Sequence, residues 1–232
     1  MLAIFLKTLP FFALIALGYW AGRTRFFTAE ATAYLTKFVF YFALSAMLFR
    51  FAANLSLAEV LDWTFVGAYL WGTAFVYLID SAVALLRWRG IEEAAVEAQC
   101  AVIGNVGFQG IPMLALLLGE NAVGPVLMVL AVDLVVFGSL IVILITGARD
   151  GRPSFAILKT IGMGLLKNPM IVSIALGLLW SSFALPIPGP VNEFLAILGA
   201  AATPGALFAI GASLAGKSAE RVTIAGWLSF CK

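Results

Sequence analysis

The sequence predicts an all-α polytopic membrane protein, and three observations support this fold class. Hydrophobic residues make up 63% of the 232 residues and charged residues only 11%, against roughly 45–50% and 25% in soluble domains. Apolar runs recur along the chain, each near the length of about 20 residues that a helix needs to cross a bilayer. Short polar breaks separate these runs. We therefore expect the lipid bilayer to surround most of the chain.

The apolar runs define seven complete spans and the start of an eighth near Val222. The sixth run is short in its purely apolar part, so we expect that helix to begin before Asn168, near Ile157. Residues 1–21 lack a basic start and a small-residue cleavage site, which indicates a retained first helix rather than a signal peptide. The seven spans are expected at about 2–21, 33–53, 63–86, 94–118, 123–146, 168–184 and 191–215.

Basic residues collect on alternate loops, and this asymmetry predicts the orientation. The loops at 54–62, 119–122 and 185–190 contain no Lys or Arg. Because cytoplasmic loops carry the excess of positive charge, we expect a multi-pass protein of the cell (inner) membrane whose N-terminus lies outside the cytoplasm. The basic residues on the predicted cytoplasmic side are Arg23, Arg25, Arg87, Arg89, Arg149, Arg152, Lys159, Lys167, Lys217 and Arg221.

Several classes of function lack their sequence signals. The chain contains no histidine and no CxxC spacing, which argues against a zinc site or a histidine-based catalytic triad. P-loop and dinucleotide-binding motifs are also absent. The spans show neither a nucleophile paired with a base nor two carboxylates on facing helices. We therefore expect no enzyme activity, no cofactor, no metal and no nucleic-acid partner.

An internal repeat relates the two parts of the chain. The pattern P-x4-I-A-L-G begins at Pro10 and again at Pro169, 159 residues later. The alternative is chance similarity, because any one of these matches could arise among common apolar residues. However, the same ungapped displacement relates residues in three spans, which favours a true repeat. Five spans separate the copies, so the second copy is inverted, as in many secondary transporters. The displacement also maps Ala43, Leu48, Phe49 and Gly67 onto Ala202, Leu207, Phe208 and Gly226.

The repeat predicts the domain organisation. We expect residues 1–147 to form a first five-helix repeat, and 148–167 to form a cytoplasmic linker and the start of the sixth helix. Residues 168–232 then form an incomplete second repeat. The counterpart of the fourth span would lie at about position 264, so we expect a C-terminally truncated chain and about 80 further residues in an intact relative.

The fourth span contains the segment most typical of a binding site. Three glycines and a proline interrupt its apolar sequence, and Pro112 is expected to break the helix because proline has no N–H to donate. Broken backbone at membrane depth is tolerated where it lines a cavity, and Asn105 and Gln109 add amide donors and acceptors. The alternative is a glycine-lined packing kink. The glycines are Gly104, Gly107 and Gly110.

Three motifs resemble the auxin efflux carrier family, which includes bacterial permeases for small organic anions. They are N-x-x-x-x-G-I-P from Asn105 to Pro112 followed by Gly119-Glu120, Asn168-Pro169, and A-x-P-x-x-L-F-x-x-G-x-S-L from Ala202 to Leu214. The resemblance implies ten helices in two inverted five-helix repeats, with broken fourth and ninth helices crossing at the substrate site. It also implies a scaffold, often a homodimer interface, made of helices 1, 2, 6 and 7. Ser45 departs from the pattern, because the repeat pairs it with Pro204.

Two aspartates lie within predicted spans. Asp133 is near the middle of 123–146, where a carboxylate costs roughly 2.5–3.5 kcal/mol on insertion scales. The family resemblance implies a substrate-facing side chain at this spacing after Pro112. Our hypothesis is that Asp133 shares a cavity with Asn105 and Gln109; the alternatives are a structural pair with Arg50 or a helix cap. For Asp80 we expect pairing with Arg87 or Arg89.

The sequence and the resemblance together predict a secondary transporter for a small organic anion. Asn105, Gln109, Asp133 and Ser45 are the candidate substrate-binding residues. Proton or sodium coupling is expected, with movement of the crossover bundle against the scaffold. Two alternatives stay open, a sodium-coupled symporter of the bile-acid type and a truncated, transport-inactive membrane fragment.

Overall fold

The computed structural model describes residues 2–55, 62–119, 122–150, 155–216 and 222–231. The chain is an all-α polytopic membrane protein, and the regular elements of these residues are helices. Five helices are long and apolar enough to cross a membrane, and the number rises to six if one divided pair counts as a single span. The five are Phe5–Arg23, Ala29–Ala53, Trp63–Leu86, Val123–Arg149 and Gly189–Leu214. They confirm the first, second, third, fifth and seventh predicted spans.

Some residues used in the predictions lie outside the described part of the chain. They are Glu120 of the family motif and Arg152, Lys217 and Arg221 of the orientation argument. The orientation itself therefore stays a prediction.

The chain forms two compact units. The first unit contains the described parts of Met1–Val60, Asn105–Leu127 and Pro169–Ser218, and the second contains those of Leu61–Gly104, Met128–Asn168 and Ala219–Lys232. Each unit therefore combines segments from both predicted repeats. The division into repeats at 1–147, 148–167 and 168–232 stays a prediction.

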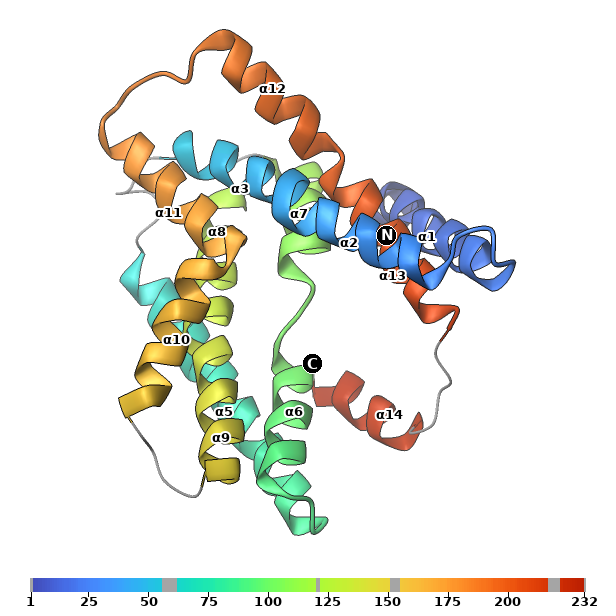
Figure 1. The fold of residues 1–232 in the computed structure, drawn as a ribbon, viewed down its shortest axis with the longest axis vertical. Coiled ribbons are helices and arrows are strands. Elements are labelled where there is room, and N and C mark those ends of the chain that lie inside the picture. Colours follow the sequence, from blue (N-terminus) through green and yellow to red (C-terminus); the bar gives the residue numbers. More distant parts are fainter. Residues whose placement is uncertain (1, 56–61, 120–121, 151–154, 217–221, 232) are drawn as a thin grey trace. The chain divides into compact units, whose positions relative to one another are not determined.

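In the first unit, α1 (Leu2–Arg23) packs along α13 (Ala202–Leu214), as Figure 1 shows. Glycines allow this approach. A Cβ atom built on Gly18 would lie 2.1 Å from the carbonyl oxygen of Phe208, and one on Gly211 would lie 2.0 Å from that of Ile15. Close backbone contact at small residues is a common way for helices to associate in membranes.

A second contact in the same unit repeats the first. The helix α3 (Leu44–Ala53) packs against α11 (Pro169–Ser182) (Figure 1), and a Cβ atom on Gly177 would lie 2.7 Å from the carbonyl oxygen of Phe49. Gly18 and Phe49 lie 159 residues before Gly177 and Phe208 respectively. Matching contacts at this displacement are what the internal repeat predicts.

Two further helices of the first unit pack beside these pairs. α2 (Ala29–Phe38) begins after Thr28, whose Oγ1 accepts a hydrogen bond from the Ala31 N–H at 3.1 Å. It continues through the π-helical turn η1 (Val39–Ala43) into α3. α12 (Gly189–Ala200) lies against α3, with the ideal Cβ position of Gly199 only 3.1 Å from Met47 Cα.

The second unit is built on α5 (Trp63–Leu86), α6 (Ile91–Val102) and α9 (Gly138–Asp150). Its core contains Tyr77, Ala98 and Phe137, which are buried together. The Tyr77 and Phe137 ring centroids are 5.9 Å apart, and the Tyr77 hydroxyl donates to the Ala95 carbonyl at 3.3 Å. α14 (Val222–Cys231) contacts α6.

The sixth predicted span is divided. The sequence predicted a single sixth helix beginning near Ile157, but α10 (Phe155–Lys167) ends before Asn168 and α11 begins at Pro169. Proline has no N–H for the helical hydrogen bond and disfavours helical backbone in the residue before it. Its fixed φ instead suits the first position of a new helix. The single-helix prediction was therefore wrong at Asn168.

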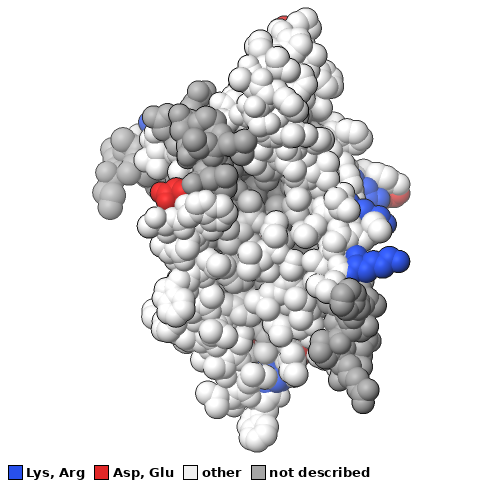
Figure 2. All heavy atoms as spheres, turned by 90° about the vertical axis from the view of Figure 1, so that its left-hand side faces the viewer, with Lys and Arg blue, Asp and Glu red and all other residues white. Residues whose placement is uncertain are grey.

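The outer surface is largely apolar, as a lipid-facing protein requires. On the face in Figure 2, uncharged residues predominate and Lys, Arg, Asp and Glu side chains are few. Large hydrophobic side chains such as Trp20, Trp63 and Trp71 are more than half exposed. In lipid this exposure carries no hydrophobic cost.

Charged residues of the second unit form ion pairs at the start of α6. Arg149 Nε and Nη2 each donate to a Glu92 carboxylate oxygen at 3.0 Å, and Arg89 lies 3.3 Å from Glu93. Arg87 pairs with Glu97, which is 8% exposed. Two of these glutamates therefore pair with arginines that follow α5, and the third pairs with an arginine of α9.

The Glu92–Arg149 pair predicts a pH-dependent contribution to stability. Hydrogen bonding from Arg149 holds the pKa of Glu92 below its ordinary value of 4.5, so the contribution is present above that value and lost as the pH falls through the folded pKa. We expect Glu92→Gln to melt slightly below the parent protein at neutral pH, and the difference to vanish in acid. The effect is small because both side chains are solvent-exposed. Thermal unfolding in detergent at several pH values checks this, and a difference that grows in acid would contradict it.

Candidate functional site

The fourth predicted span is broken. α6 ends at Val102, residues 103–105 are not helical, and the π-helical turn η2 (Val106–Gly110) then leads into α7 (Ile111–Leu118). The break lies several residues before the position that the sequence predicted. Pro112 stands in the first turn of α7, directly after η2, whose wider turn still satisfies the Ile111 N–H through the Val106 carbonyl.

Asn105 organises the backbone that follows the break. Its side-chain Oδ1 accepts a hydrogen bond from the Phe108 N–H at 3.3 Å, and its carbonyl accepts from Gln109 N at 3.1 Å and Gly110 N at 2.9 Å. Asn105 is exposed and Gln109 half-buried. In the part of the chain that is described, no acceptor takes the Asn105 side-chain N–H groups. This amide is therefore both a helix cap and an available donor.

The glycines of this segment differ in their surroundings. Gly107 is buried and Gly104 half-buried. A Cβ atom on Gly110 would lie 3.6 Å from the Asn105 carbonyl oxygen, which is ordinary van der Waals contact. The boundary between the two units falls between Gly104 and Asn105. The break is thus one of the places where the chain passes from one unit to the other.

A cavity of about 190 Å³ lies beside η2 in the first unit. Its described lining includes Phe108 of η2 but neither Asn105 nor Gln109. The wall is mainly apolar, so it suits a hydrocarbon portion of a ligand better than a charge. The other lining residues are Thr36, Val39, Ala206, Ala209, Ile210 and Ser213.

Asp133 is a buried carboxylate of the second unit. It begins the π-helical turn η4 (Asp133–Phe137), which joins α8 (Val123–Val132) to α9, and it is 4% exposed. The Tyr69 hydroxyl of α5 donates to Asp133 Oδ1 at 2.6 Å. Arg50, the alternative partner that the sequence suggested, instead donates from Nε to Asn192. A cavity shared by Asp133, Asn105 and Gln109 stays a prediction.

Sequence reasoning missed Tyr69. A hydroxyl inside an apolar span was the available signal, because a buried carboxylate needs hydrogen-bond donors. The donor lies 64 residues before its acceptor, and the sequence pattern does not specify which spans pack together.

Ser45 and Pro204 both lie in the first unit. The Ser45 hydroxyl donates to the Phe40 carbonyl at 3.3 Å, within its own helical segment. Pro204 is exposed near the start of α13. These positions assign neither residue a ligand, and the predicted roles of Ser45 in substrate binding and of Pro204 in the crossover stay predictions.

Asp80 has a different partner from the one the sequence suggested. It is fully buried and accepts a hydrogen bond from Trp227 Nε1 of α14 at 2.6 Å. Arg87 and Arg89, its expected partners, pair with glutamates instead. The expectation was wrong because these arginines follow α5 at the start of α6, where acidic side chains are closer.

The sequence is similar to those of known membrane transport proteins. The model of a family described as "Membrane transport protein" matches residues 3–226. A protein of Rhizobium meliloti (strain 1021) described as a "putative malonate transporter" is 28% identical over 216 residues. The alignment covers 92% of this chain and 68% of the relative.

Proposed function

Because the chain belongs to the membrane transport protein (auxin efflux carrier) family, we propose that it carries a small organic anion across the cytoplasmic membrane. The observation that supports this most is the break at residues 103–105 in an otherwise apolar span. Irregular backbone at membrane depth leaves polar groups for a substrate. The transport is secondary, with no covalent chemistry on the anion.

The substrate carboxylate binds at the start of η2 in this proposal. The first N–H groups of a helix have no helical acceptor and carry a partial positive charge. Asn105 adds its side-chain N–H groups, which its capping role leaves available, and Gln109 adds a second amide one turn later. These donors are neutral, so they bind an anion without a permanent counter-charge in the membrane.

The relative from Rhizobium meliloti suggests which anion to test first. Its description names malonate, a short dicarboxylate, and a molecule of that size suits amide donors clustered on one turn. We propose a short-chain carboxylate as the substrate class, with malonate as the first probe.

Movement and coupling complete the proposal. Helices 1, 2, 6 and 7 of the prediction contribute α1, α3, α11 and α13, which all lie in the first unit. We propose that these four helices are the scaffold and form a homodimer, while the broken fourth span and the segments of the second unit move. The N-terminus lies outside the cytoplasm, and protons couple transport through Asp133. Sodium coupling, as in bile-acid symporters, is the alternative, and a sodium gradient in the uptake assay separates the two.

Asn105→Ala tests the site. We expect it to lower the initial rate of malonate uptake into proteoliposomes at least about tenfold, because the variant loses both the cap and the donor. Asn105→Asp is the matched control for folding, because aspartate caps helices as well as asparagine. It should fold normally and still transport poorly, since a second carboxylate repels the anion. Parent-like uptake by either variant would refute the role of Asn105, and absence of uptake by the parent chain would refute transport of malonate.

A further inference from the structure

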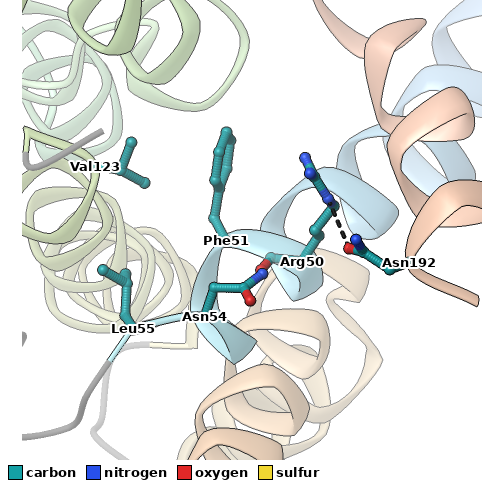
Figure 3. A pocket seen from close by; sticks show the side chains of 6 residues that line it. All are labelled: Arg50, Phe51, Asn54, Leu55, Val123 and Asn192. Carbon is teal, nitrogen blue, oxygen red and sulfur yellow. Dashed lines mark hydrogen bonds between the residues drawn. The ribbon is translucent and has the colours of Figure 1, made fainter. Parts of the chain in front are cut away.

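A second cavity lies in the first unit, away from the break. Its volume is about 290 Å³, and Figure 3 shows its lining side chains. Arg50 and Asn192 meet at one side, and Leu55 and Val123 lie at the other. The cavity combines polar and apolar walls, unlike the one beside η2. The lining residues are Arg50, Phe51, Asn54, Leu55, Val123 and Asn192.

Hydrogen bonds hold the polar wall in place. Arg50 Nε donates to Asn192 Oδ1 at 2.9 Å, and Asn54 Nδ2 donates to the Arg50 carbonyl at 2.7 Å. Because Asn192 uses its oxygen to accept from Arg50, its N–H groups remain as donors. The Arg50 terminal nitrogens likewise remain, since only Nε is engaged among the described contacts. The wall therefore presents several N–H donors and one full positive charge.

Among the described residues, Arg50 differs from three arginines of the second unit in having no ion-pair partner. Arg87, Arg89 and Arg149 each pair with a glutamate. Within the described ranges no carboxylate lies at ion-pair distance from Arg50, and the neighbouring Glu193 is exposed. A guanidinium in an apolar protein normally finds an anionic partner. An external anion would supply it.

The position of the cavity suits an entering anion. Its residues come from the end of α3 and the starts of α8 and α12, next to the loops at 54–62, 119–122 and 185–190 that contain no Lys or Arg. Arg50 is the only Lys or Arg between residues 38 and 86. On the predicted orientation, this end of the first unit faces away from the cytoplasm. Arg50 is then a rare positive charge near that surface.

We propose that this cavity is a second anion-binding site, which takes the carboxylate of a small organic anion at the non-cytoplasmic end. A guanidinium binds a carboxylate through two parallel hydrogen bonds, and the Asn192 amide adds a third donor. Phe51, Leu55 and Val123 contact the carbon portion of the ligand. Sites for small molecules occupy about 300–1,000 Å³, so this cavity accommodates only a short anion. The choice of a carboxylate as the ligand rests on the proposed function. The observation that Arg50 has no ion-pair partner among the described residues is independent of that function.

The test is equilibrium binding of labelled malonate to the full chain in detergent and in nanodiscs of neutral lipid. Measurements are made with the parent chain and with Asn105→Ala, in which the proposed contact at the break is removed. We expect Asn105→Ala to retain saturable binding. Adding Arg50→Gln to the Asn105→Ala variant should weaken malonate binding at least about tenfold. Arg50→Lys should weaken it less, because lysine keeps the positive charge but lacks the two parallel N–H donors of the guanidinium.

Two further variants separate a binding role from a structural one. Asn192→Leu should weaken binding severalfold even if Arg50→Gln fails to fold, and Lys7→Gln, which removes a positive charge outside the cavity, should leave it unchanged. Binding that survives Arg50→Gln, or no saturable binding by Asn105→Ala, would overturn the proposal. So would displacement of malonate by phosphatidylglycerol nanodiscs, which would assign the arginine to lipid phosphate. Binding tests the cavity at Arg50, and uptake tests the proposed transport function. Because the two are measured separately, failure of one proposal can be told apart from failure of the other.

Discussion

Alanine at Gly18 is expected to destabilise the first unit by about 3 kcal/mol, at the upper end of the range for overpacked cores. The added Cβ atom would lie 2.1 Å from the Phe208 carbonyl oxygen, 2.9 Å from its carbon and 3.0 Å from its Cα. All three are backbone atoms, so no side chain can rotate to make room. α1 and α13 would have to separate along a contact that both helices make through glycine.

Thermal unfolding in detergent, followed by circular dichroism, measures the effect. Gly72→Ala is the matched control, because Gly72 lies inside α5 with no atom within 4 Å of the added Cβ, and alanine there should stabilise the helix by up to about 1 kcal/mol. Gly177→Ala should cost nearly as much as Gly18→Ala, since it meets the Phe49 backbone and Ala52 within 2.7 Å. Equal melting of the Gly18 and Gly72 variants would contradict the packing of α1 on α13.

These glycines show what the sequence could predict. Gly18 and Gly177 are the last letters of the repeated pattern P-x4-I-A-L-G, so the repeat located both positions. Their contacts could not be read from it, because the pattern is one-dimensional and each glycine meets a helix distant in sequence. The spans themselves were predictable, since length and hydropathy determine which segments can cross a bilayer.

Side-chain partners were the least predictable feature. Arg50 and Asn192 are 142 residues apart, and Asp80 and Trp227 are 147 apart. Spacing along a single helix suggested nearer partners, such as Arg87 for Asp80. In the structure Asp80 instead accepts a hydrogen bond from Trp227. The position of the break in the fourth span was also hard to predict from the position of its proline. Pro112 indicated an irregular fourth span correctly, but the non-helical residues are Ile103 to Asn105, which precede the π-helical turn that leads into Pro112.

Asp133→Asn is expected to lower malonate uptake at least about tenfold and to remove its dependence on pH. The variant keeps an oxygen that can accept the Tyr69 hydroxyl and removes the charge that the proposal assigns to proton coupling. A charged carboxylate within a span costs roughly 2.5–3.5 kcal/mol on insertion scales. Neutralising it should therefore leave the melting temperature unchanged or raised. Loss of transport with gain of stability is typical of a functional charge.

Uptake into proteoliposomes between about pH 5 and pH 8, beside melting of the same samples, checks both expectations. Tyr69→Phe is the matched control: it removes the hydroxyl donor but keeps the carboxylate, so it should reduce uptake less than Asp133→Asn and retain pH dependence. A structural role predicts the opposite pattern, in which Asp133→Asn melts lower and transports in proportion to the folded protein that remains. If Asp133→Asn transports like the parent at every pH, proton coupling through this residue is wrong, and sodium-gradient uptake becomes the next measurement.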